Sequence, residues 1–473
     1  MTLRILGLAW LCLVCGWANA ADYVIVVSKA TQSDAGWREV VATLEKKHSA
    51  EVVAYDRSIA EALPRLSQQM PRFTCFVATP SEATREFVAE VHRLTRKLDD
   101  DPYTDTRWGV LTGFDAANAR TIAAETQLLV VKKVAAGTDV ALEKCQEGLW
   151  YCELQQQRMV RKAPGGVVKQ EVGPADTTAA LAATLTDYKA DLFVTSGHAT
   201  ERDWQIGFRY RNGSFQSQAG KLFGVDTQRK RTEIRSDSPK VYLAVGNCLM
   251  GHIDGPDAMA LAFMNSAGMR QMAGYTVLTW YGYAGWGCLD YFVEQPGRYS
   301  LNEAFLANQH ALVHRLQTYF PELMSETPPP GQVARRNMVL TDTAKAEKLT
   351  SMDGLGLLHD RDVLAFYGDP AWDARLATAE CAWDQTLTSQ GGVFTLTIKP
   401  KLGAKTFEPV SRNGSQRGGR PIIEYLPQRI RNVKLTKGAD LQPVITDDFV
   451  LIPNPKTCDR DVYEVTFTAD ILK

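Results

Sequence analysis

The sequence lacks several patterns that would point directly to a common function. No serine lies in a Gly-x-Ser-x-Gly turn, so there is no support for a serine hydrolase of the α/β-hydrolase type. No Gly-x-Gly-x-x-Gly follows a strand-like run and opens a helix, so a nucleotide-binding site is also unsupported. The formal net charge is only −1 and no basic stripe is present, which argues against nucleic acid as a partner. After residue 20 no run of about 18 apolar residues occurs, and we expect no membrane span.

The first twenty residues have the pattern of an export signal. Arg4 precedes the apolar stretch Ile5–Trp17, and Ala18-Asn19-Ala20 follows as a small-residue cleavage site. The apolar stretch is too short for a membrane-spanning helix. We therefore expect a signal peptide at residues 1–20 and a mature protein that is secreted or periplasmic.

The cysteine content fits an exported protein with at least one free thiol. Of nine cysteines, two lie in the signal peptide, which leaves an odd number in the mature chain. Cys248 is the candidate for the free thiol. Cys145 with Cys152, and Cys381 with Cys458, are pairings that only the geometry can test.

Strand-like and helix-like segments alternate along most of the chain. Tyr23–Ser28 and Phe73–Thr79 have the composition of strands, whereas Ser33–His48 and Ser81–Lys97 have helical periodicity. This alternation predicts an α/β fold with a mainly parallel sheet flanked by helices. The polar segment Cys145–Gly173 breaks the pattern, and we interpret it as a connector or flap.

The character of the sequence changes after residue 377. Strand-like runs separated by Gly, Asn and Pro replace the alternation, with no helical stretch between them, which predicts a small β-sandwich. We therefore expect a signal peptide at 1–20, an N-terminal α/β subdomain at 21–175, a second α/β subdomain at 176–377 and a β-sandwich domain at 378–473.

Two β-favouring runs, fifty residues apart, each end in glycine close to a reactive side chain. The run Asp191–Gly197 leads to His198, and the run Lys240–Gly246 leads to Cys248. If the two runs are neighbouring parallel strands, both side chains emerge at the carboxyl edge of one sheet, where open α/β sheets place their sites. A thiol beside an imidazole is the minimum requirement for a cysteine nucleophile with an acid/base partner.

The order of these motifs resembles the caspase-like cysteine peptidases, in particular the gingipain-like branch. Gly197-His198, Cys248 and the turn Gly368-Asp369-Pro370 occur here in the family's order, before a β-rich tail, over roughly residues 180–473. The resemblance implies a caspase-like catalytic region at residues 176–377, an immunoglobulin-like sandwich after it, and an exported cysteine endopeptidase that acts on peptides or proteins. It implies no metal and no cofactor.

The resemblance also implies roles for individual residues. Cys248 attacks the peptide carbonyl, favoured by the start of a following helix, while His198 protonates the leaving amine and then activates water. The backbone N–H groups of Ala199 and Cys248 bind the oxyanion. Ala199 stands where the family has glycine, and Asn247 where it has a smaller residue. Asn247 either donates to the oxyanion or caps the following helix.

The substrate pocket is expected among the residues after the next strand. Trp280 and Tyr281 lie between glycines and suit a slot for a long side chain, although a buried aromatic cluster fits equally well. Asp290 either pairs with a basic substrate side chain or is an ordinary helix residue. These three are the candidate substrate-binding residues.

Three other histidines offer alternatives to this assignment. His252, four residues after Cys248, competes with His198 as the acid/base. His310 and His314 lie four apart on a helix, but the Glu that a zinc peptidase needs after the first histidine is absent, so we expect a solvated helix face and no metal site. Two further functions stay open: a catalytically silent binding or scaffold protein with the same fold, and a transpeptidase-like cysteine acyl transferase.

Overall fold

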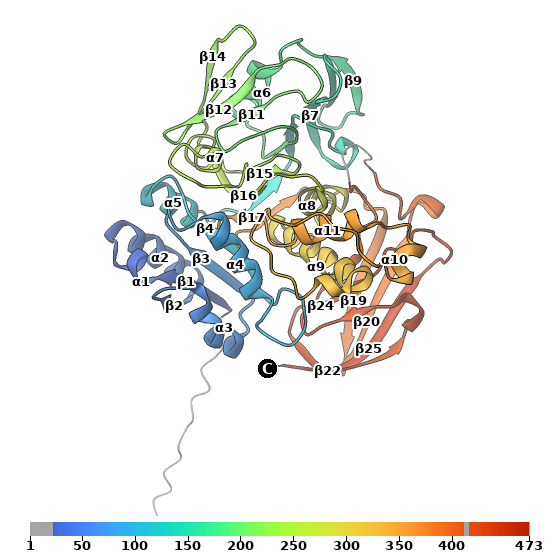
Figure 1. The fold of residues 1–473 in the computed structure, drawn as a ribbon. Helices are drawn as coiled ribbons and strands as arrows, with labels where there is room; N and C mark the ends of the chain where they lie inside the picture. Colours follow the sequence, from blue (N-terminus) through green and yellow to red (C-terminus); the bar gives the residue numbers. More distant parts are fainter. Residues whose placement is uncertain (1–21, 411–415, 473) are drawn as a thin grey trace, which may run out of the picture.

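A twelve-stranded sheet forms the centre of the protein (Figure 1). The structure is a computed structural model that describes residues 22–410 and 416–472, so the expected signal peptide lies outside the described residues. Eight of the eleven neighbouring strand pairs run parallel, and three run antiparallel. The expected α/β fold with a mainly parallel sheet flanked by helices is confirmed.

Several neighbouring strands of the sheet come from distant parts of the chain. From edge to edge the strands are β2 (Glu51–Tyr55), β1 (Tyr23–Ser28), β3 (Phe73–Val77), β4 (Arg107–Leu111), β17 (Leu364–Tyr367), β16 (Met269–Tyr275), β15 (Lys240–Ala244), β10 (Leu192–Thr195), β6 (Lys133–Ala136), β7 (Glu147–Tyr151), β8 (Arg158–Lys162) and β9 (Lys169–Val172). The central strands are buried on both faces, which explains their nearly continuous apolar runs. The expected α/β subdomains at 21–175 and 176–377 both contribute strands to this one sheet.

Helices of eight residues or more surround the sheet. They are α2 (Ala35–His48), α4 (Arg85–Thr95), α5 (Ala116–Ala123), α6 (Thr178–Thr186), α7 (Met259–Ser266), α8 (Tyr283–Glu294), α9 (Leu301–Tyr319) and α11 (Ser351–Asp360). Shorter ones are α1 (Lys29–Ser33), α3 (Leu63–Gln69) and α10 (Asp342–Ala346). The capping box that opens α9 joins the backbone N–H and side chain of Ser300 to Glu303. Within the described ranges, no helix combines the length and apolar character that crossing a membrane requires.

The segment Cys145–Gly173 is part of the sheet and not a connector or flap. It contributes β7, parallel to β6, and the antiparallel edge strands β8 and β9. All four residues of β9 are exposed, as befits a sheet edge, which explains why the polar composition concealed the strands. Because β7 belongs to the sheet, Glu153, which follows this strand, lies at the same edge of the sheet as the segments after β6 and β10.

A small antiparallel sheet is inserted between the strands that lead to His198 and Cys248. It comprises β11 (Asp203–Gln205), β12 (Ser214–Gln218), β13 (Lys221–Val225) and β14 (Arg231–Ile234). Trp204 and Phe215 of this sheet pack on Phe193, with ring centroids 6.1 and 6.2 Å away. β11 and β12 pair antiparallel on either side of Asn212-Gly213.

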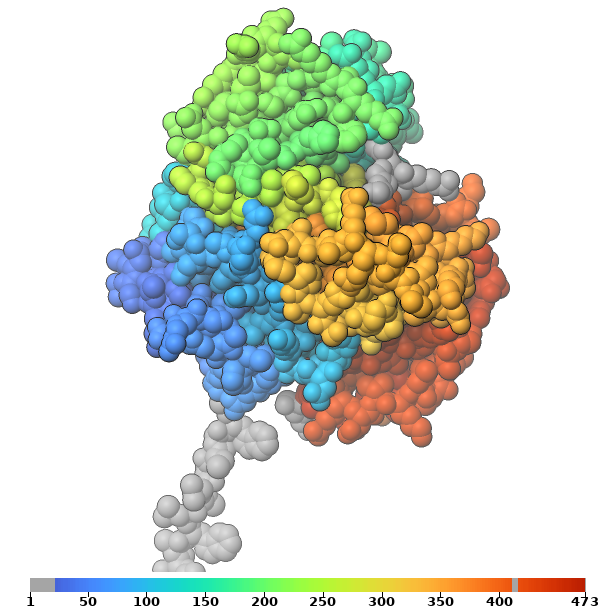
Figure 2. Space-filling view, viewed as in Figure 1, coloured from blue at the N-terminus to red at the C-terminus, as the bar shows by residue number. Residues whose placement is uncertain are grey.

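The C-terminal region forms two antiparallel sheets with a hydrophobic core of their own. One contains β19 (Trp383–Gln390), β20 (Val393–Pro400), β25 (Tyr463–Ile471) and β22 (Ile430–Lys437); the other contains β21 (Ile422–Tyr425), β24 (Phe449–Ile452) and β23 (Val444–Ile445). The region packs directly on the α/β part (Figure 2). Tyr291 of α8, for example, donates a hydrogen bond to the carbonyl oxygen of Pro421 at 2.7 Å.

The seven cysteines in the described ranges are all free thiols. Cys145 and Cys152 flank β7, and an extended strand of this length holds them roughly 20 Å apart, beyond disulfide range. The sulfur of Cys381 instead lies 3.9 Å from the carbonyl oxygen of Pro296, and that of Cys458 lies 3.7 Å from the carbonyl oxygen of Arg460. Neither of the two pairings considered above forms.

Candidate active site

The strands that lead to His198 and Cys248 are neighbours in the sheet. β10 pairs in parallel with β15, from Leu192 opposite Val241 to Thr195 opposite Ala244. This expected pairing is confirmed, and both following segments leave the sheet at its carboxyl edge. There His198 and Cys248 line the same cavity, which has a volume of about 460 Å³.

Five segments of the chain contribute to the wall of this cavity. The lining residues are Ser196, Gly197 and His198 after β10; Gly246 and Cys248 after β15; Thr279, Trp280, Tyr281, Gly282 and Trp286 between β16 and α8; Glu153 and Leu154 after β7; and Phe208 and Arg209 after β11. The cavity therefore combines a nucleophile, an imidazole, a carboxylate and an aromatic wall.

Cys248 is half-buried and held by the chain segment that follows β16. Its Sγ accepts a hydrogen bond from the backbone N–H of Thr279 at 3.2 Å. The residues that follow Cys248 form turns, and Leu249 has a φ of +60°. The next helix, α7, begins only at Met259, so the expected helix start directly after Cys248 does not occur in the structure.

His198 is exposed on a loop, and its ring packs against Phe208 with a centroid separation of 4.7 Å. The preceding residue, Gly197, has a φ of +98°, a conformation that favours glycine. Ala199 is not among the described residues with positive φ, so its methyl group introduces no backbone strain. The position that is glycine in the resembling family therefore does not require glycine here.

The backbone around the two reactive residues leaves N–H groups available. Ala199 pairs with Trp204 in an isolated antiparallel bridge, in which the hydrogen bonds are made by neighbouring residues. Within the described part of the chain, the N–H groups of Ala199 and Cys248 have no hydrogen-bond acceptor. Cys248 lines the cavity, whereas Ala199 is not among the residues that do so.

Asn247 links the two loops and is completely buried. Its Oδ1 accepts a hydrogen bond from Thr195 Oγ1 at 2.6 Å, and its Nδ2 donates to the carbonyl oxygen of Gly197 at 3.1 Å. Its own carbonyl oxygen accepts from Thr279 Oγ1 at 3.1 Å. The side chain therefore neither faces an oxyanion nor caps a helix, because both of its polar atoms are used to hold the loops together.

The two aromatic residues proposed for the pocket do line the cavity. Trp280 is 38% exposed, and its ring lies 5.4 Å from that of His359. The hydroxyl of Tyr281 donates to Asp353 Oδ1 at 3.1 Å, which fixes this ring in the wall. Trp286 adds a third aromatic surface from α8.

Asp290, by contrast, lies outside the cavity lining. Its side chain is buried in α8, where one carboxylate oxygen accepts from Arg417 Nε at 2.7 Å and the other from Arg420 Nε at 3.1 Å. Both arginines come from the C-terminal region. The expected contact with a substrate side chain is thus replaced by a buried ion pair that attaches this region to α8.

Glu153 is the cavity residue that sequence reasoning missed. It is 7% exposed; its Oε1 accepts from Thr138 Oγ1 at 2.9 Å, and its buried Oε2 has no hydrogen-bond partner among the described residues. Burial raises the pKa of this carboxyl to about 7, although the nearby hydroxyls of Thr138 and Ser196 act in the opposite direction. The signal was the apolar run of β7 that ends in Cys152-Glu153, which is similar to the runs before His198 and Cys248 except that it does not end in glycine.

The three alternative histidines are all engaged elsewhere. His252 is 8% exposed, contacts Glu201 Oε1 at 2.9 Å and does not line the cavity. The expectation of a solvated face for His310 is wrong, because this residue is completely buried and contacts the carbonyl oxygen of Thr104 at 3.0 Å. Burial lowers the pKa of His310 to about 3 and that of His314 to about 4.

Two clusters in the described ranges bring possible metal ligands within 4.8 Å of one another. They are Glu201, His252 and Asp254, and Asp99, Asp101 and Asp105. In the first cluster, guanidinium groups already neutralise the carboxylates. Neither cluster lines the cavity of Cys248.

No protein-family model matches this chain, and a search of curated proteins finds none with significant similarity.

Proposed function

We propose that the protein is a cysteine endopeptidase in which Cys248 is the nucleophile and His198 the acid/base. The observation that supports this most is that both side chains line one cavity at the carboxyl edge of two paired parallel strands. We further propose that the α/β region is caspase-like and the C-terminal region immunoglobulin-like. The order of Gly197-His198, Cys248 and Gly368-Asp369-Pro370 before two antiparallel sheets supports this assignment.

The proposed reaction divides peptide hydrolysis into two acyl-transfer steps. The Cys248 thiol gives its proton to His198 and the sulfur forms a bond to the carbonyl carbon, while the negative charge that develops on the oxygen is stabilised by backbone N–H donors such as that of Cys248. The C–N bond then breaks as His198 transfers a proton to the departing amine. Water, deprotonated by His198, hydrolyses the thioester and restores the thiol.

We propose that the side chain preceding the cleaved bond is positively charged. A substrate ammonium or guanidinium would supply the missing partner of Glu153 Oε2, which otherwise remains buried without one. Phe208, Trp280 and Trp286 line the same cavity, and aromatic faces attract cations. Ionised Glu153 would therefore be stabilised by such a substrate more than by a neutral or acidic one.

Peptidyl acyloxymethyl ketones that differ only in the residue next to the reactive group test this function. We expect the lysine probe to label wild-type protein at Cys248, as shown by peptide mass spectrometry, and not to label Cys248→Ala. His198→Ala should be labelled much more slowly. Cys458→Ala is the matched control, because Cys458 is also partly exposed but lies outside the cavity.

The same experiment separates the competing functions. Absence of labelling at Cys248 with every probe would contradict the peptidase and favour a binding or scaffold protein. Equal labelling by lysine, leucine and aspartate probes would contradict the proposed role of Glu153 but not the peptidase function. A separate incubation with a lysine-containing substrate peptide and an added amine tests the third function, since accumulation of the peptide joined to the amine, instead of the hydrolysed peptide, would indicate an acyl transferase.

A further inference from the structure

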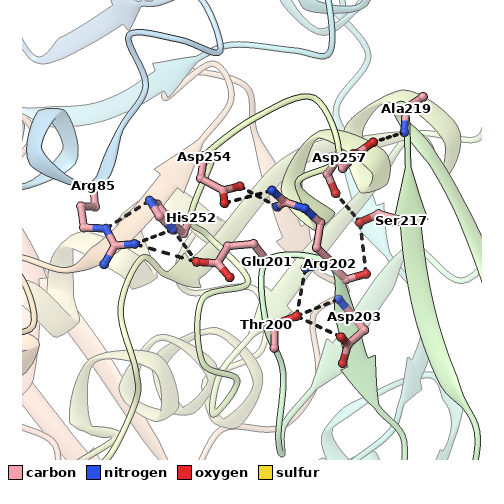
Figure 3. Close-up of polar contacts among 10 residues, drawn as sticks. All are labelled: Arg85, Thr200, Glu201, Arg202, Asp203, Ser217, Ala219, His252, Asp254 and Asp257. Carbon is pink, nitrogen blue, oxygen red and sulfur yellow. Dashed lines mark hydrogen bonds and ion pairs between the residues drawn. The ribbon is translucent and has the colours of Figure 1, made fainter.

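The loops that carry His198 and Cys248 are joined a second time, outside the cavity, by two side-chain pairs (Figure 3). Glu201 Oε1 contacts His252 Nδ1 at 2.9 Å. Arg202 binds both carboxylate oxygens of Asp254, at 2.6 and 3.0 Å. Each pair has one member on each loop, and the first begins only three residues after His198 and four after Cys248.

Arg85, the first residue of α4, connects this junction to the N-terminal part of the chain. Its Nε lies 3.1 Å from His252 Nε2, and its Nη2 lies 2.7 Å from Nδ1 and 3.9 Å from Glu201 Oε1 (Figure 3). The imidazole thus lies between a carboxylate and a guanidinium, and the carboxylates of Glu201 and Asp254 are balanced by Arg85 and Arg202.

None of these five residues lines the cavity of Cys248. We therefore expect these side chains to act on the reaction through the two loops that they join. Backbone contacts add to the junction, since the N–H of Met259 donates to the carbonyl oxygen of Glu201 at 2.7 Å. Because catalytic groups must be placed to within a fraction of an ångström, a contact that fixes two loops relative to each other can control the reaction rate.

We propose that Arg85, Glu201, Arg202, His252 and Asp254 form a clamp that sets the separation of His198 and Cys248. This inference rests on the proposed function, and it makes the five side chains positioning residues for the reaction. The clamp spans three separate segments, at residue 85, residues 201–202 and residues 252–254. Its loss should slow the chemical step without weakening the binding of substrate.

The inactivation kinetics of the full-length protein with the lysine acyloxymethyl ketone test the clamp. We expect Arg85→Met to reduce the maximal rate of inactivation by about tenfold to a hundredfold, with the half-saturating probe concentration unchanged. Arg65→Met is the matched control, because Arg65 forms an exposed ion pair with Glu51 far from the cavity.

A charge exchange provides a test that does not depend on a single variant folding. Arg202→Asp and Asp254→Arg should each slow inactivation, and the double exchange should restore it to within about threefold of wild type. A wild-type rate in Arg85→Met and in both single reversals would overturn the clamp, as would a folded double variant as slow as the single ones. A wild-type protein in which Cys248 is never labelled would instead contradict the proposed function, and the clamp with it.

Discussion

The side chain of Asn247 donates a hydrogen bond to the carbonyl oxygen of Gly197, with Nδ2 and O separated by 3.1 Å. The residue before the candidate nucleophile thereby holds the residue before the candidate acid/base. Thr195 Oγ1 completes the link by donating to Asn247 Oδ1. Asn247 thus joins the two loops beneath the cavity, in addition to the proposed clamp outside it.

Asn247→Ala should destabilise the protein and slow labelling of Cys248. The substitution leaves the Gly197 carbonyl without this donor and Thr195 Oγ1 without this acceptor in a buried place, which should lower the free energy of unfolding by about 1–3 kcal/mol. We expect labelling by the lysine probe to slow about tenfold or more. Urea denaturation and inactivation kinetics measure the two effects. Gln156→Ala, which removes an exposed amide-to-carbonyl bond to Ala175, is the control, and equal losses in both variants would refute the role of Asn247.

Binding of the lysine probe should strengthen as the pH rises through about 7. Burial raises the pKa of Glu153 to about 7, so the carboxyl is neutral below this pH and ionised above it. Only the ionised form attracts a cation strongly. Glu153→Gln should abolish this pH dependence and weaken probe binding about tenfold at pH 8, as measured by the half-saturating concentration. A leucine probe serves as the control, and the proposal fails if both probes respond equally to the substitution.

Asp105→Asn should stabilise the protein in alkaline solution. Burial, together with Asp99 and Asp101, raises the pKa of Asp105 to about 9, so the folded state retains a proton that the unfolded state releases. The contribution of this group to stability is therefore present at low pH and is lost as the pH rises towards 9. We expect the variant to unfold with a free energy about 1–3 kcal/mol higher than wild type at pH 9 and similar to it at pH 4.

Chemical denaturation at several pH values measures this difference. Asparagine keeps an oxygen that can accept the hydrogen bond from the N–H of Leu98. Asp342→Asn is the control, because Asp342 is fully exposed. A constant difference between Asp105→Asn and wild type across the pH range would contradict the assignment.

Asp290→Ala should reduce stability and leave the substrate preference unchanged. Removing this carboxylate takes away a buried partner of Arg417 and Arg420, and the loss of one member of a buried ion pair costs about 3–5 kcal/mol. Asp384→Ala removes the carboxylate of an exposed pair with Lys401 and should cost about 1 kcal/mol at most. Denaturation curves measure both stability losses. A change in the preference for lysine over leucine probes in Asp290→Ala would contradict the prediction and indicate that Asp290 contributes to substrate recognition.

Local sequence patterns predicted a strand or helix correctly where the segment's own residues determine its secondary structure. The apolar run before His198 and that before Cys248 predicted two strands, and the periodicity of Ser33–His48 predicted the helix α2. The same reasoning failed for β8 and β9, because edge strands are polar and have little apolar periodicity to detect. It also failed for His310, whose burial depends on Thr104 and on Phe449 from the C-terminal region.

The sequence by itself determined that the chain alternates strands and helices, that it ends in strands, and that a histidine and a cysteine each follow a buried strand. Only the tertiary structure decided that Glu153 shares their cavity, that Asp290 is held by Arg417 and Arg420, and that Arg85 reaches His252. The physical reason is that strand order and the packing of remote segments depend on pairings across the whole sheet. Such pairings leave no mark in the short windows from which periodicity and spacing are measured.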